Sequence, residues 1–306
     1  MLEFKRMDPA FREEYNALLA ASGRQGCEYT FVNLSLWGRQ RMAQFGDWVV
    51  LFSQYGRCSV YPFPVGVGDP RPVLEAIFED ARHRGIPCRL TGLRQEDCDL
   101  LESVCPGKFR FHPDRDSFDY VYNIEDLAFL KGKRYQSKRN FCNRFWNNNP
   151  HCTLVPITGE NLPQVQTMLD QWYHDRLQAD PYQDFLLEQL ALSRAFSHWA
   201  QLGMVGLALM DDQQVIAFSM ASPLGYDTFD VHFEKALDIA EGAYAAINQG
   251  LARYLMGQYP HVKWLNREDD MGLPGLRKAK LSYNPDHMVE KYWARLWEEE
   301  DETETP

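Results

Sequence analysis

Apolar residues recur along the chain with two different periods, which predict two kinds of element. Phe11, Tyr15 and Leu18 are spaced as on one face of a helix over residues 9–21. Residues 117–124 alternate apolar and polar side chains, as a half-buried strand does. The first half also predicts strands over residues 48–54, 58–65 and 87–93 and helices over residues 72–84 and 95–104.

The second half of the chain restarts a similar order of elements. Its clearest helix covers residues 241–256, where Tyr244, Ile247, Leu251 and Leu255 form one apolar stripe. The other predicted helices cover residues 161–177, 185–202 (as one or two helices) and 275–281, and the predicted strands cover residues 152–156, 205–210, 215–221, 228–235, 262–266 and 287–292. This order predicts an α/β (α+β) fold with a mixed sheet and helices on both faces, of which the first half is a weaker copy.

A chain of 306 residues is long enough for two domains. Residues 131–149 carry six basic side chains and no acid, and an Asn-rich stretch ends this segment. We therefore expect an N-terminal domain at 1–130, a basic helix at the junction at 131–150, a C-terminal domain at 151–297 and an acidic tail at 298–306.

The net charge, the cysteines and the apolar runs limit the partners and the cellular compartment that we expect. The net charge is −11, which argues against general coating of nucleic acid. The seven cysteines show no Cys-x-x-Cys spacing, so we predict free thiols in a reducing cytoplasm and no metal site. No apolar run is long enough to span a bilayer, and no integral membrane segment is expected.

The strand over residues 228–235 offers a candidate catalytic group. Alternation along this strand would place Asp230, His232 and Glu234 on one face. Either His232 or Glu234 could take a proton from an attacking nucleophile. The same pattern also fits a solvated sheet face or an ion pair with Lys235 or Arg267, and the sequence leaves both interpretations open.

Two further segments carry candidate binding residues. Gly242 stands at the start of the amphipathic helix, where free N–H groups could meet a phosphate or carboxylate, and Tyr244 and Asn248 follow it. The second segment follows the strand over residues 262–266, and its candidates for holding a polar substrate are Asn266, Arg267, Glu268 and Asp270. An ordinary helix start and an ordinary acidic loop are the alternatives.

Two basic clusters stand out in an otherwise acidic chain. One consists of Lys131, Lys133, Arg134, Lys138 and Arg139, and the other contains Lys278 and Lys280. Basic residues beside aromatics suit a polyanion such as tRNA, a coenzyme phosphate or a phospholipid headgroup. A solvated helix face is the alternative. The motifs of P-loop hydrolases, serine esterases and zinc proteases are absent from the sequence.

Four stretches together resemble a known family. They begin at Lys131 (KGKRYQSKRNF), His232 (HFEKA), Glu241 (EGAYAAIN) and Asn266 (NREDDMGLPGLRKAKLSYNP). With these motifs the chain resembles uncharacterised bacterial proteins classed with the C-terminal domain of phosphatidylglycerol lysyltransferase. The resemblance implies two tandem GNAT-like acyltransferase domains and kinship with Fem-type enzymes, which move an aminoacyl group from tRNA to an amine or hydroxyl.

The resemblance also bears on the donor. Acetyl-coenzyme A enzymes of this fold carry Arg/Gln-x-x-Gly-x-Gly/Ala where the central helix starts, but Leu237 and Ala240 stand at two of those positions here. We therefore expect an aminoacyl-tRNA-dependent acyltransferase acting on a small-molecule or peptide acceptor, with no firmly implied cofactor. An acyl-coenzyme A enzyme and a non-catalytic module that binds a small anion are the alternatives.

Overall fold

The computed structural model describes residues 1–37, 40–55 and 58–296, which form two compact units. Unit 1 consists of residues 1–119, 269–272 and the chain from 289 onward, and unit 2 of residues 120–268 and 273–288. These units differ from the expected domains, because residues 120–130 and the basic segment are part of unit 2. The predicted acidic tail lies outside the described residues.

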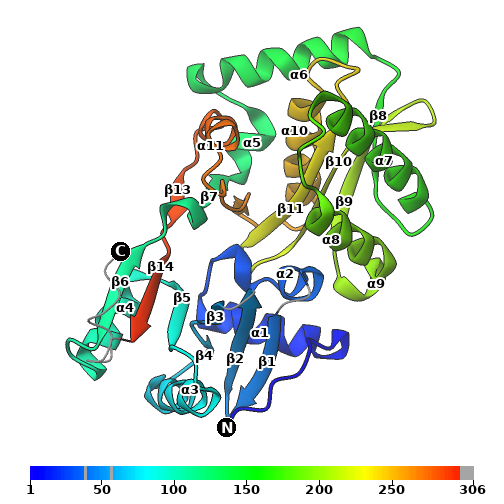
Figure 1. The fold of residues 1–306 in the computed structure, drawn as a ribbon. Coiled ribbons are helices and arrows are strands. Elements are labelled where there is room, and N and C mark those ends of the chain that lie inside the picture. The colour runs from blue at the N-terminus through cyan, green and yellow to red at the C-terminus, as the bar shows by residue number, and fades with distance from the viewer. Residues whose placement is uncertain (38–39, 56–57, 297–306) are drawn as a thin grey trace. The chain divides into compact units, whose positions relative to one another are not determined.

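Unit 1 is built on a mixed sheet flanked by helices (Figure 1). The strand order is β1-β2-β3-β5-β14-β6, with β4 paired to β2. The strands are β1 (Gln40–Phe45), β2 (Trp48–Tyr55), β3 (Cys58–Pro62), β4 (Val65–Gly66), β5 (Arg89–Leu93), β6 (Phe109–Pro113) and β14 (Tyr292–Leu296). The helices are α1 (Arg12–Ser22), α2 (Phe31–Leu36), α3 (Arg71–Arg84) and α4 (Gln95–Val104).

Unit 2 contains a second mixed sheet with the order β13-β7-β12-β11-β10-β9-β8. Its strands are β7 (Asp119–Asn123), β8 (Thr153–Pro156), β9 (Val205–Asp211), β10 (Gln214–Pro223), β11 (Thr228–Ala236), β12 (Trp264–Asn266) and β13 (His287–Val289). Its helices are α5 (Ile124–Phe129), α6 (Gln136–Asn148), α7 (Leu162–Ala179), α8 (Leu186–Ser197), α9 (Trp199–Leu202), α10 (Ala243–Gln258) and α11 (Pro274–Leu281).

Helices cover both faces of the unit 2 sheet, as predicted. Glu234 on β11 bonds Asn248 of α10, whereas the Nζ atom of the next residue, Lys235, lies 4.0 Å from the ring centroid of Trp172 on α7. Because consecutive strand residues point to opposite faces, α10 and α7 lie on opposite sides of the sheet (Figure 1). The core under α10 includes Phe229, Val231 and Ile247.

Most predicted elements are confirmed, but the last strand is not a single one. The predicted strand over residues 287–292 is divided into β13, which joins the sheet of unit 2, and β14, which joins the sheet of unit 1. The elements β1, β6, α2 and α5 were not anticipated. Among the described residues, no helix has the length and apolar character needed to cross a bilayer.

Candidate active site

The sheet of unit 2 opens between its parallel strands β11 and β12. Their pairing runs from Thr228 opposite Trp264 to Asp230 opposite Asn266. Strand β12 ends there, while β11 continues for six more residues to Ala236. Polar side chains that follow these last pairs therefore lie where the two strands separate, which is a favoured position for ligands in sheets with parallel strands.

A β-bulge at His232 changes the predicted faces of β11. On the neighbouring strand β10, Met220 pairs with Phe233 but Ala221 pairs with Val231, so His232 is an extra residue. The bulge reverses the alternation, and Glu234 points to the same face as Val231. The expectation that Asp230, His232 and Glu234 share one face is therefore wrong: Asp230 and His232 lie on one face, and Glu234 lies on the other.

On the α10 face, Glu234 is the centre of a hydrogen-bonded cluster. Its Oε1 atom lies 2.8 Å from Nη2 of Arg267, the residue that follows β12. Its Oε2 atom accepts hydrogen bonds from Asn248 on α10, at 3.2 Å, and from Ser219 on β10, at 3.3 Å. Three elements thus hold one carboxylate, and that carboxylate bridges the opening between β11 and β12.

Arg267 contacts two aromatic rings. Its Cζ atom is 4.9 Å from the ring centroid of Tyr283 and 5.5 Å from that of Tyr122. Burial lowers the pKa of Arg267, but the attraction of Glu234 and the two tyrosines outweighs this effect and leaves the pKa above its ordinary value. Arg267 is therefore a permanent cation. Lys280, predicted to hold phosphates, instead donates its ammonium group to the carbonyl oxygen of Arg267 at 2.5 Å.

Two buried polar atoms of this cluster have no hydrogen-bond partner, namely Nη1 of Arg267 and Oδ1 of Asn248. A carboxylate can only accept hydrogen bonds, so the amide nitrogen of Asn248 must face Glu234 and its oxygen must point elsewhere. Unpaired buried donors and acceptors are costly and rare in proteins. The cluster therefore offers one donor and one acceptor to a further molecule.

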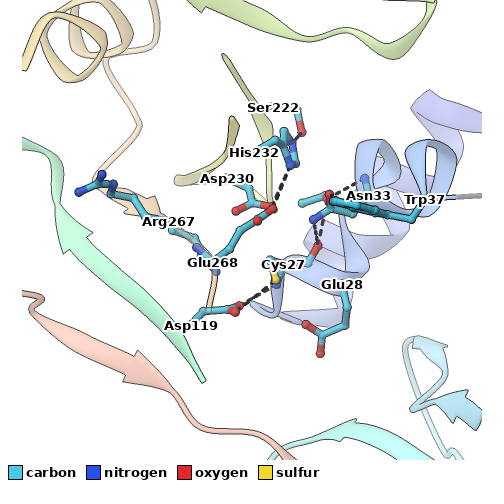
Figure 2. A network of polar contacts seen from close by, with 12 residues as sticks. Cys27, Glu28, Asn33, Trp37, Asp119, Ser222, Asp230, His232, Arg267 and Glu268 are labelled. Atoms are coloured by element: carbon cyan, nitrogen blue, oxygen red, sulfur yellow. Dashed lines mark hydrogen bonds and ion pairs between the residues drawn. The ribbon is translucent and has the colours of Figure 1, made fainter. Parts of the chain in front are cut away.

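On the opposite face, His232 connects a serine with two carboxylates (Figure 2). Its Nε2 atom lies 2.7 Å from Oγ of Ser222, and its Nδ1 atom lies 3.3 Å from Glu268 and 3.4 Å from Asp230. A neutral ring facing carboxylates at Nδ1 carries its proton there, which leaves Nε2 to accept the serine proton. Asp230, His232 and Glu268 each offer one possible metal-ligand atom. These three atoms lie within 4.8 Å of one another, close enough to bind a single cation.

The segment after β12 distributes its side chains between these two clusters. Figure 2 shows Arg267 and Glu268 pointing away from each other, which takes one to each face. Asn266 accepts the Glu268 N–H at 2.7 Å and so shapes the turn that both residues share. Asp270 does not join them as expected: it belongs to unit 1, where it is fully buried and lies 3.4 Å from Arg115.

Gly242 has a packing role in place of the predicted anion contact. Its φ angle is +93°, and a Cβ atom at this position would lie 2.4 Å from the carbonyl oxygen of Phe141 on α6. The backbone of α6 thus occupies the place beside the start of α10 where a phosphate was expected to approach. Tyr244, the second residue of α10, is 37% exposed.

The structure divides the predicted basic residues into hydrogen-bonded and exposed ones. Arg134 is paired with Asp126 at 2.5 Å, and Arg139 donates to the carbonyl oxygens of Leu130 and Gly132. These two arginines therefore stabilise the turn that leads into α6. The exposed lysines of the predicted set are Lys131, Lys133 and Lys278.

Lys138 differs from these exposed lysines because it is partly buried. Its Nζ atom lies 4.0 Å from the ring centroid of Tyr283, the same ring that contacts Arg267. Burial, and then the positive charge of Arg267, lower the pKa of Lys138.

Sequence reasoning missed the residues that support the named ones. The sequence pattern identifies only ordinary core or strand positions at Tyr122, Tyr283, Ser219 and Ser222. Their contacts with Arg267, Glu234 and His232 become visible only in the tertiary structure. In unit 1 it also missed a buried charge cluster, in which Lys291 contacts Asp119 at 2.7 Å and Glu28 at 2.6 Å. Burial lowers the pKa of Lys291, but these acids outweigh it, and the pKa is well above the ordinary value.

Comparison with known proteins places the chain among relatives of similar architecture. A conserved protein of unknown function from Bacteroides thetaiotaomicron VPI-5482 is 36% identical, with 97% of this chain and 100% of that chain covered and a TM-score of 0.92. An uncharacterised protein of Mycoplasmoides gallisepticum is 27% identical over 182 residues, which is 59% of this chain. The match covers 56% of that curated relative, so it spans little more than half of its length.

More distant solved structures share the fold alone. L-PGS from Bacillus licheniformis is 18% identical, with 95% of this chain and 92% of that chain covered and a TM-score of 0.67. FemX is 8% identical, with 95% of this chain and 97% of that chain covered and a TM-score of 0.60. A tandem GNAT protein from the clavulanic acid biosynthesis pathway is 8% identical, with 97% of this chain and 99% of that chain covered and a TM-score of 0.51. The predicted mixed α/β fold of the tandem GNAT type is thereby confirmed.

Residues 19–295 match the family described as "Phosphatidylglycerol lysyltransferase, C-terminal". This match covers nearly all of the described chain, including both polar clusters around β11. The chain therefore belongs to the family of the C-terminal domain of phosphatidylglycerol lysyltransferase.

Proposed function

We propose that this protein is an acyltransferase that moves an aminoacyl group from aminoacyl-tRNA to an amine or hydroxyl acceptor. The family and its fold support acyl transfer in general. The two polar clusters on either side of the opening between β11 and β12 supply groups suited to this chemistry. The acyl carbonyl would lie in unit 2, beside the ends of their pairing at Asp230 and Asn266.

The observation that carries the choice of donor is the contact at the start of α10. Acyl-coenzyme A enzymes of this fold hold a pyrophosphate against that helix start. Here the carbonyl oxygen of Phe141 occupies the space beside Gly242, and Leu237 and Ala240 depart from the pyrophosphate motif. The α6 backbone approaches the glycine where the pyrophosphate would lie, and two motif residues are replaced, so aminoacyl-tRNA is the better candidate donor.

The proton transfer is assigned to the His232 cluster. As the nucleophile attacks the ester carbonyl, its proton passes to the Ser222 hydroxyl while the serine proton moves to Nε2 of His232. Asp230 and Glu268 stabilise the imidazolium that results. The bond from the carbonyl carbon to the ribose oxygen then breaks, and the proton returns along the same path to that oxygen. The products are the aminoacylated acceptor and free tRNA.

Glu234 is assigned a positioning role. Both of its oxygens already accept hydrogen bonds, from Arg267, Asn248 and Ser219, which leaves it poorly suited as a base. By holding Arg267 and Asn248 in place, it aims the free Nη1 donor and the free amide oxygen at the ligand. An anionic oxygen of the donor substrate is a suitable partner for Nη1. The exposed Lys131, Lys133 and Lys278 would contact phosphates of the tRNA.

Transfer from charged tRNA tests this function directly. The purified protein is incubated with tRNA carrying radiolabelled amino acids and with hydroxylamine as a small nucleophile, and formation of the aminoacyl hydroxamate is followed. We expect the wild-type protein to accelerate hydroxamate formation. His232→Gln should lower the rate by about 10²–10⁴, the usual loss when a general base is removed.

Lys263→Met serves as a control variant, because this exposed lysine of unit 2 lies outside both clusters. It should leave the rate unchanged. If the folded wild-type protein does not accelerate hydroxamate formation above the uncatalysed rate, the proposed function is wrong. If His232→Gln and Lys263→Met react equally fast, His232 is not the base.

A further inference from the structure

Two cations of unit 2 share the ring of one tyrosine. The Nζ atom of Lys138 lies 4.0 Å from the ring centroid of Tyr283, and the Cζ atom of Arg267 lies 4.9 Å from the same centroid. The electron-rich face of an aromatic ring attracts a cation, but it does not neutralise the charge. Two neighbouring cations on one ring therefore repel each other unless anions lie nearby.

The carboxylates in this part of unit 2 balance only one of these charges. Glu234 pairs with Arg267. Lys138 has no carboxylate within ion-pair distance among the residues that the structure describes. Burial and the charge of Arg267 lower the pKa of Lys138, which is the expected response of a cation that lacks a counter-ion. The site thus carries an excess of positive charge in a partly desolvated position.

Arg267 adds an unused hydrogen-bond donor to this excess charge. Its Nη2 atom faces Glu234, whereas its buried Nη1 atom has no hydrogen-bond partner. An arginine in this state is prepared for a second oxyanion, since its planar group presents several donors at fixed angles. The unpaired donor and the unbalanced lysine belong to two side chains that contact the same ring, and they are independent observations of missing negative charge.

We propose that Lys138 and Nη1 of Arg267 form a binding subsite for a phosphate ester, in which one non-bridging oxygen accepts from Arg267 and another contacts Lys138. The basic segment favours a phosphate of a polynucleotide over a lone carboxylate. The exposed Lys131 and Lys133 precede Lys138 on this segment. Together the three lysines supply positive charge for successive phosphates of a polynucleotide strand.

The choice of a tRNA phosphate as the ligand of this subsite rests on the proposed function. Phosphate esters occur both at the unpaired 3′ end of tRNA and in coenzyme A, so the experiment includes both sources. A fluorescently labelled CCA trinucleotide with a 5′ phosphate and unlabelled coenzyme A as a competitor are the probes. Binding to the full chain is measured by fluorescence anisotropy at two salt concentrations.

Two variants separate the subsite from general electrostatic attraction. Lys138→Met keeps the length of the side chain and removes the charge, and Arg267→Lys keeps a cation opposite Glu234 but removes Nη1. Each should weaken trinucleotide binding by about 10- to 100-fold, the value of a lost charge-assisted hydrogen bond. Lys138→Met should also lower the salt slope by about 0.7, the share of one phosphate of a single strand.

Lys133→Met is the matched control, since it removes an equally charged but exposed lysine of the same segment. It should lower the salt slope similarly but weaken binding by less than about threefold, as an exposed contact does. Circular dichroism verifies that each variant is folded. Equal losses for Lys133→Met and Lys138→Met would overturn the subsite, as would wild-type protein that binds neither probe at low salt.

The outcomes also separate this proposal from the proposed function. If binding depends on Lys138 but no hydroxamate forms, the subsite stands and the transferase assignment fails. If hydroxamate forms and Lys138→Met binds the trinucleotide like the wild type, the subsite fails alone. Competition by coenzyme A that depends on Lys138 would support the subsite and identify a coenzyme as its source of phosphate.

Discussion

The close approach of α6 to the start of α10 is best tested by giving Gly242 a side chain. The donor assignment depends on this contact, because it fills the place where a pyrophosphate would bind. In Gly242→Ala, the new Cβ atom would lie 2.4 Å from the carbonyl oxygen of Phe141 and 3.1 Å from Cβ of Phe145. The first neighbour is backbone, so relief requires that helix α6 move.

Two costs add up in this variant. An alanine at a φ angle of +93° carries strain of about 1–2 kcal/mol, because its side chain crowds the backbone there. Overpacking against α6 adds about 1–3 kcal/mol. Gly225→Ala is the matched control, since Gly225 has a φ angle of +77° in the same unit but open space around its Cβ position. Gly225→Ala therefore carries the backbone strain but no overpacking.

Differential scanning calorimetry of the two variants measures the contact itself. At about 2–4 °C per kcal/mol for a unit of this size, Gly242→Ala should unfold about 2–12 °C below Gly225→Ala. Equal transition temperatures would mean that α6 does not press on the start of α10. The space beside Gly242 would then be free for a phosphate, and the argument against coenzyme A would be lost.

Further predictions concern the Glu234 cluster and the thiols. Glu234→Gln leaves the buried charge of Arg267 without its carboxylate and should reduce the free energy of unfolding by about 3–5 kcal/mol. The double variant Glu234→Gln/Arg267→Met should be less destabilised than the single one in urea unfolding, and additive losses would show that the two groups are not coupled. Burial raises the pKa of the Cys142 thiol to about 11, so iodoacetamide at pH 8 should modify the exposed Cys58 first. Mass spectrometry of the native protein measures this order, and early modification of Cys142 would contradict its burial.

Local patterns predicted most elements of the fold because the signals are themselves local. The helix α4 begins and ends at the predicted residues, and α3 ends at the predicted Arg84, with Gly85 as its C-cap. The strands β1 and β6 were missed because polar residues such as Arg41 and Arg110 interrupt their apolar pattern. The division of the last strand into β13 and β14 depends on which sheet each half joins, and a short-range pattern carries no such information.

The sequence indicated several residues of the two polar clusters but not how they are arranged. Glu234, Arg267 and Asn248 do come together, because the strand ends and the helix face carry them to one place. The bulge at His232 could not be anticipated, since it depends on the register with β10, and it places Glu234 on the face opposite Asp230 and His232. The basic neighbours of Lys280 predict a ligand contact, but its ammonium group donates a hydrogen bond to the carbonyl oxygen of Arg267.

Binding of charged tRNA tests the central claim most directly. Purified protein is titrated with aminoacyl-tRNA, with deacylated tRNA and acetyl-coenzyme A as comparators, at two salt concentrations. We expect salt-sensitive binding that favours the charged tRNA, because the unpaired amide oxygen of Asn248 gains a partner only when the aminoacyl group is present. If the folded protein does not bind aminoacyl-tRNA even at low salt, the aminoacyl-tRNA assignment is contradicted.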